Sequence, residues 1–187
     1  MEFDRDFVET LERIEPILTN LGLPHFFTGG IVAALYGEPR MTQDADIVLR
    51  IQEDQAGLLV EALEPKFLVD RDDVLGAIRK SRIFQAIDLD TMVKVDFHIG
   101  EAVPGEFDRI RTVQLFSGSS EYPVVSKEDA ILSKLLWIQK GSHKSRADVV
   151  AMLFAPDTFD LKFVREMAEH LGVKPILEEL WNDAHSG

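Results

Sequence analysis

The chain has 187 residues, 45% of them hydrophobic, and a formal net charge of −13 at pH 7, which suits one globular domain with a sizeable hydrophobic core. It contains no cysteine, which excludes disulfides, thiolate zinc sites and a cysteine nucleophile. The negative charge opposes non-specific binding to nucleic acid and to anionic membranes, because both depend on a positive field.

The first residues are acidic rather than basic. Glu2, Asp4 and Asp6 surround a single Arg5, unlike the start of a signal peptide. No apolar run in the chain approaches the roughly 18 residues that span a bilayer. We therefore expect no membrane contact and a cytoplasmic location.

The first predicted elements are a helix, a strand and a second helix. Apolar residues recur at helical spacing over residues 3–20, which predicts an amphipathic helix. Residues 25–27 predict a short buried strand that stops at the glycine pair Gly29-Gly30, and residues 31–36 predict a helix. The local order is strand, tight turn, helix.

The middle of the chain predicts further strands. Residues 46–51 fit a strand and residues 53–64 fit a helix. Residues 83–89 and 93–99 fit the two strands of a hairpin, and residues 113–116 fit an edge strand.

The last third of the chain predicts helices. Residues 117–123 are rich in Ser and Gly and favour a loop and a boundary. Ser126, with Asp129 three residues later, is typical of a helix start. Further helices are predicted over residues 145–154, 160–171 and 174–183. We expect a single α+β unit, in which a small mixed β-sheet flanked by helices (about 1–120) precedes a C-terminal helical extension (about 124–187).

The glycine pair Gly29-Gly30 lies between a predicted strand and a predicted helix. Bare backbone N–H groups at such a helix start can approach phosphate oxygens. The alternative is a turn that only needs positive φ. No Gly-Lys-Ser/Thr follows, which disfavours a P-loop.

Asp44 and Asp46 would share one face of a strand, since side chains two residues apart point the same way. Adjacent carboxylates repel each other and favour a divalent cation. The chain has other Asp-x-Asp pairs, but only this one follows a glycine pair and the alternating Arg40 and Thr42. A solvated strand end is the alternative interpretation.

A third carboxylate, Asp96, alternates with apolar residues and shares its predicted face with Lys94 and His98. If this strand neighbours the strand of Asp44 and Asp46, three carboxylates can hold two divalent ions and accept a proton from an attacking hydroxyl. We expect His98 to be an exposed bystander, and Lys94 to contact either phosphate or a carboxylate.

Lys134 has its stem on an apolar helix face and therefore needs an anionic partner. That partner is either a nucleotide phosphate or Asp148. Asp148 also fits the third position of a helix cap that begins at Ser145.

These motifs resemble the nucleotidyltransferase superfamily, the DNA polymerase beta-like fold. The spacing G-G-x9-R-x-T-x-D-x-D is similar to that of AbiEii-type toxins and their bacterial relatives. The resemblance places Asp44, Asp46 and Asp96 as metal and catalytic residues, and Gly29, Gly30, Arg40, Thr42, Lys134 and Asp148 as nucleotide-binding residues.

The resemblance implies Mg²⁺, with Mn²⁺ as a substitute, and a nucleoside triphosphate whose nucleoside monophosphate passes to an acceptor hydroxyl with release of pyrophosphate. It suggests a toxin-like enzyme that acts on transfer RNA and has an antitoxin protein as partner. The chain has Ala151 where relatives often carry a second acidic residue, which weakens the toxin assignment. The alternatives are an antibiotic-modifying nucleotidyltransferase and a non-catalytic module that binds nucleotide or a toxin-antitoxin partner.

Overall fold

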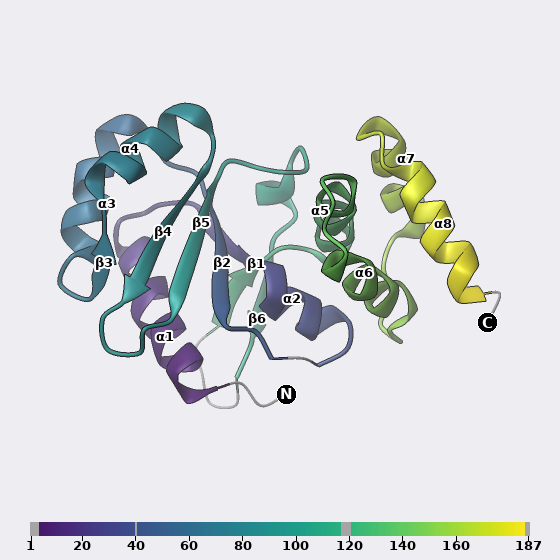
Figure 1. Ribbon diagram of the computed structural model, residues 1–187, viewed down its shortest axis with the longest axis horizontal. Coiled ribbons are helices and arrows are strands. Elements are labelled where there is room, and N and C mark those ends of the chain that lie inside the picture. The colour runs from purple at the N-terminus through teal and green to yellow at the C-terminus, as the bar shows by residue number, and fades with distance from the viewer. Residues whose placement is uncertain (1–3, 40, 117–120, 186–187) are drawn as a thin grey trace.

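The computed structural model describes residues 4–39, 41–116 and 121–185. Within these residues, seven strands form one mixed sheet in the order β3-β4-β5-β2-β1-β7-β6 (Figure 1). The strands are β1 (His25–Thr28), β2 (Asp44–Leu49), β3 (Phe67–Val69), β4 (Ile83–Asp88), β5 (Lys94–Ile99), β6 (Arg111–Gln114) and β7 (Glu121–Val124). The α-helices are α1 (Arg5–Asn20), α2 (Gly29–Tyr36), α3 (Ala56–Leu63), α4 (Arg71–Lys80), α5 (Lys127–Gln139), α6 (Lys144–Phe154), α7 (Leu161–His170) and α8 (Lys174–His185).

The centre of the sheet is strand β2. It pairs antiparallel with β1, with Thr28 opposite Asp46, and parallel with β5, with Asp46 opposite Asp96. Its side chains alternate: Ala45 and Ile47 are buried, whereas Asp44 and Asp46 are only partly buried. One face of β2 therefore belongs to the core and the other presents carboxylates.

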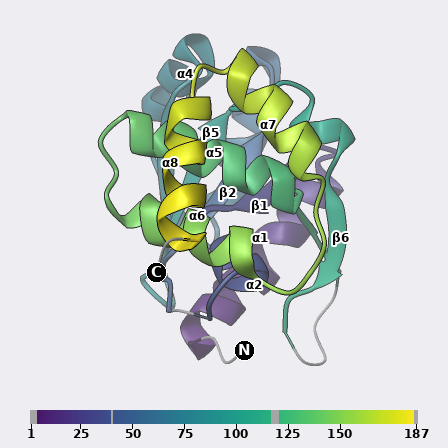
Figure 2. The ribbon, with the colours of Figure 1, turned by 90° about the vertical axis from the view of Figure 1, so that its right-hand side faces the viewer.

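Helix α2 links the sheet to the carboxyl-terminal helices, because it contacts β1 and β2 as well as α5 and α6. Helices α5 to α8 gather at one end of the molecule, where Figure 2 shows them from outside. Ile131 and Leu135 of α5, Val149 of α6 and Val164 of α7 are buried in the same apolar core as the strands. This packing sets a wall of helices opposite the carboxylate face of β2.

Most predicted elements are confirmed, and so is the α+β fold class. The hairpin of β4 and β5 is present, and Ser126 caps α5 by accepting a hydrogen bond from the Asp129 N–H at 3.2 Å. No helix among the described residues is long and apolar enough to cross a membrane.

Two predictions need correction. In the loop predicted at 117–123, residues 117–120 lie outside the described residues, and residues 121–123 belong to strand β7. Pro123 suggested a break, but a proline is tolerated in this short strand, which has one paired residue in β1. The predictions also missed β3, which has only three residues, and α4, which begins with an acidic first turn and contains Gly76.

Candidate active site

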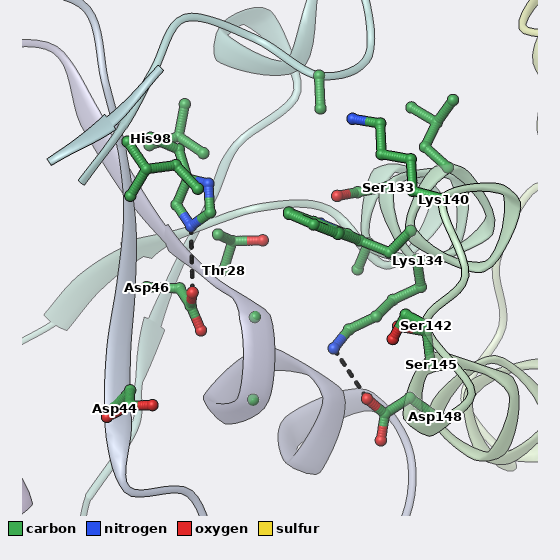
Figure 3. Close-up of a pocket in the computed structure, with 18 of the residues that line it drawn as sticks. Thr28, Asp44, Asp46, His98, Ser133, Lys134, Lys140, Ser142, Ser145 and Asp148 are labelled. Carbon is green, nitrogen blue, oxygen red and sulfur yellow. Dashed lines mark hydrogen bonds and ion pairs between the residues drawn. The ribbon is translucent and has the colours of Figure 1, made fainter. Parts of the chain in front are cut away.

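A pocket of about 860 Å³ lies between the sheet and the carboxyl-terminal helices (Figure 3). One wall, here called the sheet wall, is formed by Thr28, Gly29, Gly30, Thr42, Asp44, Asp46 and His98. The other, here called the helical wall, is formed by Ser133, Lys134, Lys140, Ser142, Lys144, Ser145 and Asp148. The pocket thus sets a carboxylate pair opposite a group of lysines and hydroxyls.

Gly29 begins α2 with φ +67°, a left-handed conformation that favours glycine. A Cβ at this position would lie 1.9 Å from Asp46 Oδ2. The glycine is therefore required both by the backbone conformation and by the close approach of Asp46. Gly29 has the positive φ that a turn would need, and Gly30 follows it as a buried residue of α2, while the phosphate-binding role of the pair stays a prediction.

Asp44 and Asp46 both point from β2 toward the pocket, as predicted from their spacing (Figure 3). Thr42 lines the pocket too, and its hydroxyl donates to the Asp44 carbonyl at 3.1 Å. Residue 40 lies outside the described residues, so the nucleotide-binding role predicted for Arg40 stays a prediction.

The sequence predicts an exposed bystander at His98, but the side chain is only partly exposed and contacts Asp46. Its Nε2 lies 3.1 Å from Asp46 Oδ1, and its ring meets the ring of Trp137 edge-on at 6.4 Å between centroids. The sequence could have indicated this contact, because the alternation in β5 puts His98 on the same face as Asp96. Parallel pairing with β2 then brings that face beside Asp46. His98 holds one oxygen of a proposed metal ligand.

Asp96 lies beside Asp46 because β5 pairs with β2, as predicted for neighbouring strands. Its carboxylate accepts a hydrogen bond from Gln85 Nε2 at 2.9 Å and forms an ion pair with Lys94 Nζ at 3.3 Å. Lys94 also forms an ion pair with Asp44 at 3.5 Å. Burial lowers the pKa of Lys94, but the carboxylates of Asp96 and Asp44 outweigh burial and raise it overall, so Lys94 is an ammonium at neutral pH.

On the helical wall, Lys134 Nζ donates to Asp148 Oδ2 at 2.8 Å (Figure 3). Both side chains are largely buried, which is the pairing that a buried lysine requires. Ser145 does not cap α6, because its hydroxyl lies 2.9 Å from that of Ser142 and the helix begins at Lys144. Asp148 therefore serves as the partner of Lys134 rather than as part of a helix cap.

Two further lining residues, Trp137 and Glu106, were not singled out from the sequence. Lys140 Nζ lies 5.2 Å above the Trp137 ring. Burial, together with the nearby carboxylates of Asp129 and Glu101, raises the pKa of Glu106 to about 7, although the Ala102 N–H donates to it at 2.8 Å. No sequence pattern marks Glu106, since it lies in a connecting segment without periodicity.

The donor set of the sheet wall suits Mg²⁺, which takes one or two carboxylates plus phosphate oxygens rather than an all-protein cage. Asp44 and Asp46 are the two carboxylates, and they lie beside a backbone turn at Gly29 that has no room for a Cβ. Across the part of the chain that the structure describes, no three His, Asp or Glu side chains are grouped closely enough to hold a metal ion. The three-carboxylate metal site thus stays a prediction.

Comparisons with known proteins identify the fold. No protein-family model and no curated protein matches the sequence. The antibiotic-resistance factor ANT(2'')-Ia superposes with a TM-score of 0.58 at 13% identity, over 98% of this chain and 100% of that chain. The structure of its complex with adenylyl-2''-tobramycin superposes with a TM-score of 0.51 at 16% identity, over 96% of this chain and 97% of that chain. A nucleotidyltransferase-like antigen of Paracoccidioides brasiliensis superposes with a TM-score of 0.53 at 16% identity, over 94% of this chain and 90% of that chain.

This chain has a nucleotidyltransferase fold. The fold that the resemblance implied is confirmed, whereas the comparisons give no support to the AbiEii-type toxins in particular. The nucleotidyltransferase fold brings together on one pocket most of the residues that the resemblance singled out, namely Gly29, Gly30, Thr42, Asp44, Asp46, Lys134 and Asp148.

Proposed function

We propose that the chain is a metal-dependent nucleotidyltransferase that binds a nucleoside triphosphate in this pocket. One observation carries the proposal: the positive-φ Gly29 packs against Asp46, beside Asp44, and the lysines of the helical wall stand across the same pocket. A bound triphosphate needs both the carboxylates beside the glycine turn and the lysines across the pocket. Backbone N–H groups and ammonium groups bind its oxygens, and carboxylates hold its metal ion.

The triphosphate would lie between the start of α2 and the helical wall. The N–H groups of Gly29 and Gly30 are at a helix N-terminus, where the helix dipole favours negative charge. Lys134 stands on the opposite wall, where its ammonium can contact a phosphate while Asp148 orients it. On the sheet wall, the Thr42 hydroxyl donates to the Asp44 carbonyl at the start of β2.

Asp44 and Asp46 would hold Mg²⁺, with Mn²⁺ as a substitute. When bound, the ion neutralises phosphate charge and polarises the phosphorus centre. The protein itself supplies orientation: β2 fixes both carboxylates on one face, and His98 holds Asp46 by one oxygen.

In the proposed reaction, the oxygen of an acceptor hydroxyl forms a bond to the α-phosphorus. The bond from that phosphorus to the oxygen bridging it to the β-phosphorus breaks, and pyrophosphate leaves with the electron pair. The hydroxyl proton passes to a carboxylate, for which we propose Asp96 because it lies beside Asp46.

We propose a small molecule as the acceptor. The chain's charge of −13 opposes RNA binding, and the related fold of ANT(2'')-Ia is known with an adenylylated aminoglycoside. Two alternatives remain for the following test. The acceptor could be transfer RNA, as for a toxin-like enzyme, or the chain could be a non-catalytic module that binds nucleotide or an antitoxin.

The test uses purified protein, Mg²⁺ and each of the four nucleoside triphosphates labelled at the α-phosphate. Separate reactions contain an aminoglycoside panel, a lincosamide or total RNA. Asp44→Asn is the inactive variant, and Asp54→Asn, an exposed carboxylate in the segment before α3, is its matched control. Label on a small molecule, lost only in Asp44→Asn, supports the proposal. Label on RNA would show that the acceptor is RNA rather than a small molecule. Nucleotide binding without transfer would show that the chain is a binding module rather than an enzyme.

A further inference from the structure

Lys94 occupies an unusual place in the carboxylate cluster. It stands on β5 directly opposite Asp44 of β2, and Asp96 follows it two residues later on the same face. Its ammonium lies 3.5 Å from Asp44 Oδ2 and 3.3 Å from Asp96 Oδ2. One ammonium thus bridges two of the three carboxylates that the proposed function assigns to metal and proton transfer.

Asp96 is held at both of its oxygens. Oδ1 accepts the amide N–H of Gln85 and Oδ2 faces Lys94. Neither interaction comes from the pocket, whose lining includes Asp44 and Asp46 but not Asp96. Asp96 can therefore join an ion bound at Asp44 only if Lys94 withdraws.

The side chain of Lys94 is one third exposed, so it has room to move toward water. The Lys94 ammonium and a divalent cation beside Asp44 and Asp96 would repel each other, because both are positive. Each of them neutralises negative charge on these same two carboxylates. The two cations compete for Asp44 and Asp96.

We propose that Lys94 is a built-in competitor of the divalent ion at Asp44 and Asp96. The inference rests on the proposed function, because it needs the metal site at Asp44 and Asp46. Lys94 balances the carboxylates before metal enters, weakens metal binding to the nucleotide-free protein, and releases Asp96 when the ion arrives. It acts as a positioning residue, through Asp96.

The test measures Mn²⁺ binding to the nucleotide-free protein by the loss of the free-ion electron paramagnetic resonance signal. Lys94→Met removes the charge and keeps the length of the side chain. We expect it to bind Mn²⁺ about tenfold more tightly, because one nearby positive charge is lost at a position that water partly screens. Lys94→Arg keeps the charge and should retain the wild-type affinity.

Two controls accompany this variant. Lys162→Met removes an exposed lysine that pairs with Glu166 on α7, and its Mn²⁺ affinity should equal that of the wild type. The double variant Lys94→Met with Asp96→Asn should lose the gain, since Asp96 is the ligand that Lys94→Met releases. Circular dichroism melting checks that each variant is folded.

The outcomes are distinct. Equal Mn²⁺ affinity in the wild type and Lys94→Met, with binding lost in Asp44→Asn, overturns the competition by Lys94 and leaves the proposed metal site standing. Absence of Mn²⁺ binding in the wild type and in Lys94→Met, both without and with nucleotide, overturns both the competition and the proposed metal site. A gain that survives Asp96→Asn overturns the role assigned to Asp96.

Discussion

The sheet wall and the helical wall of the pocket are built by different physical means. On the sheet wall, backbone geometry sets the site: Thr28 pairs with Asp46 in the β1–β2 register, and Gly29 turns directly against that carboxylate. On the helical wall, one ion pair between two helices, Lys134 with Asp148, orients the charge that faces the ligand. The sheet wall is therefore set by the backbone, whereas the helical wall depends on an ion pair between side chains that a ligand can compete with.

The largest expected effect is on the sheet wall. Asp44→Asn should reduce nucleotidyl transfer by about a thousandfold or more, because the amide no longer neutralises a divalent ion. The melting temperature should stay near that of the wild type, since Asp44 is about half exposed. Rate measurements on Asp44→Asn and Asp54→Asn check this, and equal rates in the two variants would place the chemistry elsewhere.

Gly29→Ala tests the backbone geometry of the same wall. Its Cβ would overlap Asp46 and the residue would keep φ +67°, so we expect about 3 kcal/mol loss of unfolding free energy together with loss of nucleotide binding. Gly22→Ala is the matched control, because Gly22 has φ +65° but no atom within 4 Å of its added Cβ. That variant should lose about 1 kcal/mol. Urea unfolding compares the two, and equal losses would mean that the contact with Asp46 is unimportant.

Lys134→Met tests the helical wall. It leaves Asp148 largely buried without this ammonium, so we expect about 2 kcal/mol loss of stability and about tenfold weaker nucleotide binding. Lys144→Met, on the same wall but with an exposed side chain, should change stability little. Calorimetric titration with a nucleotide whose α–β bond cannot be cleaved measures the binding. Unchanged affinity in Lys134→Met would remove Lys134 from the nucleotide site.

The last effect is expected at Glu106, which lines the pocket. Burial raises its pKa from 4.5 to about 7, so the folded protein binds this proton more tightly than the unfolded chain. Stability should therefore fall by about 2 kcal/mol as the pH rises from about 5 to about 8. Glu106→Gln cannot ionise and should lose this part of the pH dependence. Urea unfolding across that range measures it, and an identical pH profile in the variant would refute the assignment.

The sheet wall was the more predictable of the two. The alternation around Asp44 and Asp46 and the glycine pair before α2 are local patterns, and a strand turns them directly into a shared face. The place of Asp96 followed from the same alternation, once its strand was assumed to neighbour that of Asp46. The alternation of polar and apolar residues predicts a face but not the rotamer of a side chain. The rotamers turn Asp96 toward Gln85 and bring His98 to Asp46.

The helical wall was predictable only in part. An apolar helix face indicated that Lys134 needs an anion, and Asp148 was one of two partners considered, but the choice depends on how α5 packs against α6. Glu106 could not be found, since its burial arises from tertiary packing of a connecting segment. The strand β7 was missed for a similar reason, because pairing with β6 outweighs the local effect of Pro123.

The most direct test of the central claim compares the fate of two labels. The wild-type protein is incubated with Mg²⁺, an acceptor and the same nucleoside triphosphate labelled either at the α-phosphate or at the γ-phosphate. The account predicts that the α-label appears on the acceptor, the γ-label appears in pyrophosphate, and both products vanish in Asp44→Asn. Transfer of the γ-label to the acceptor, or equal transfer by Asp44→Asn, would contradict it.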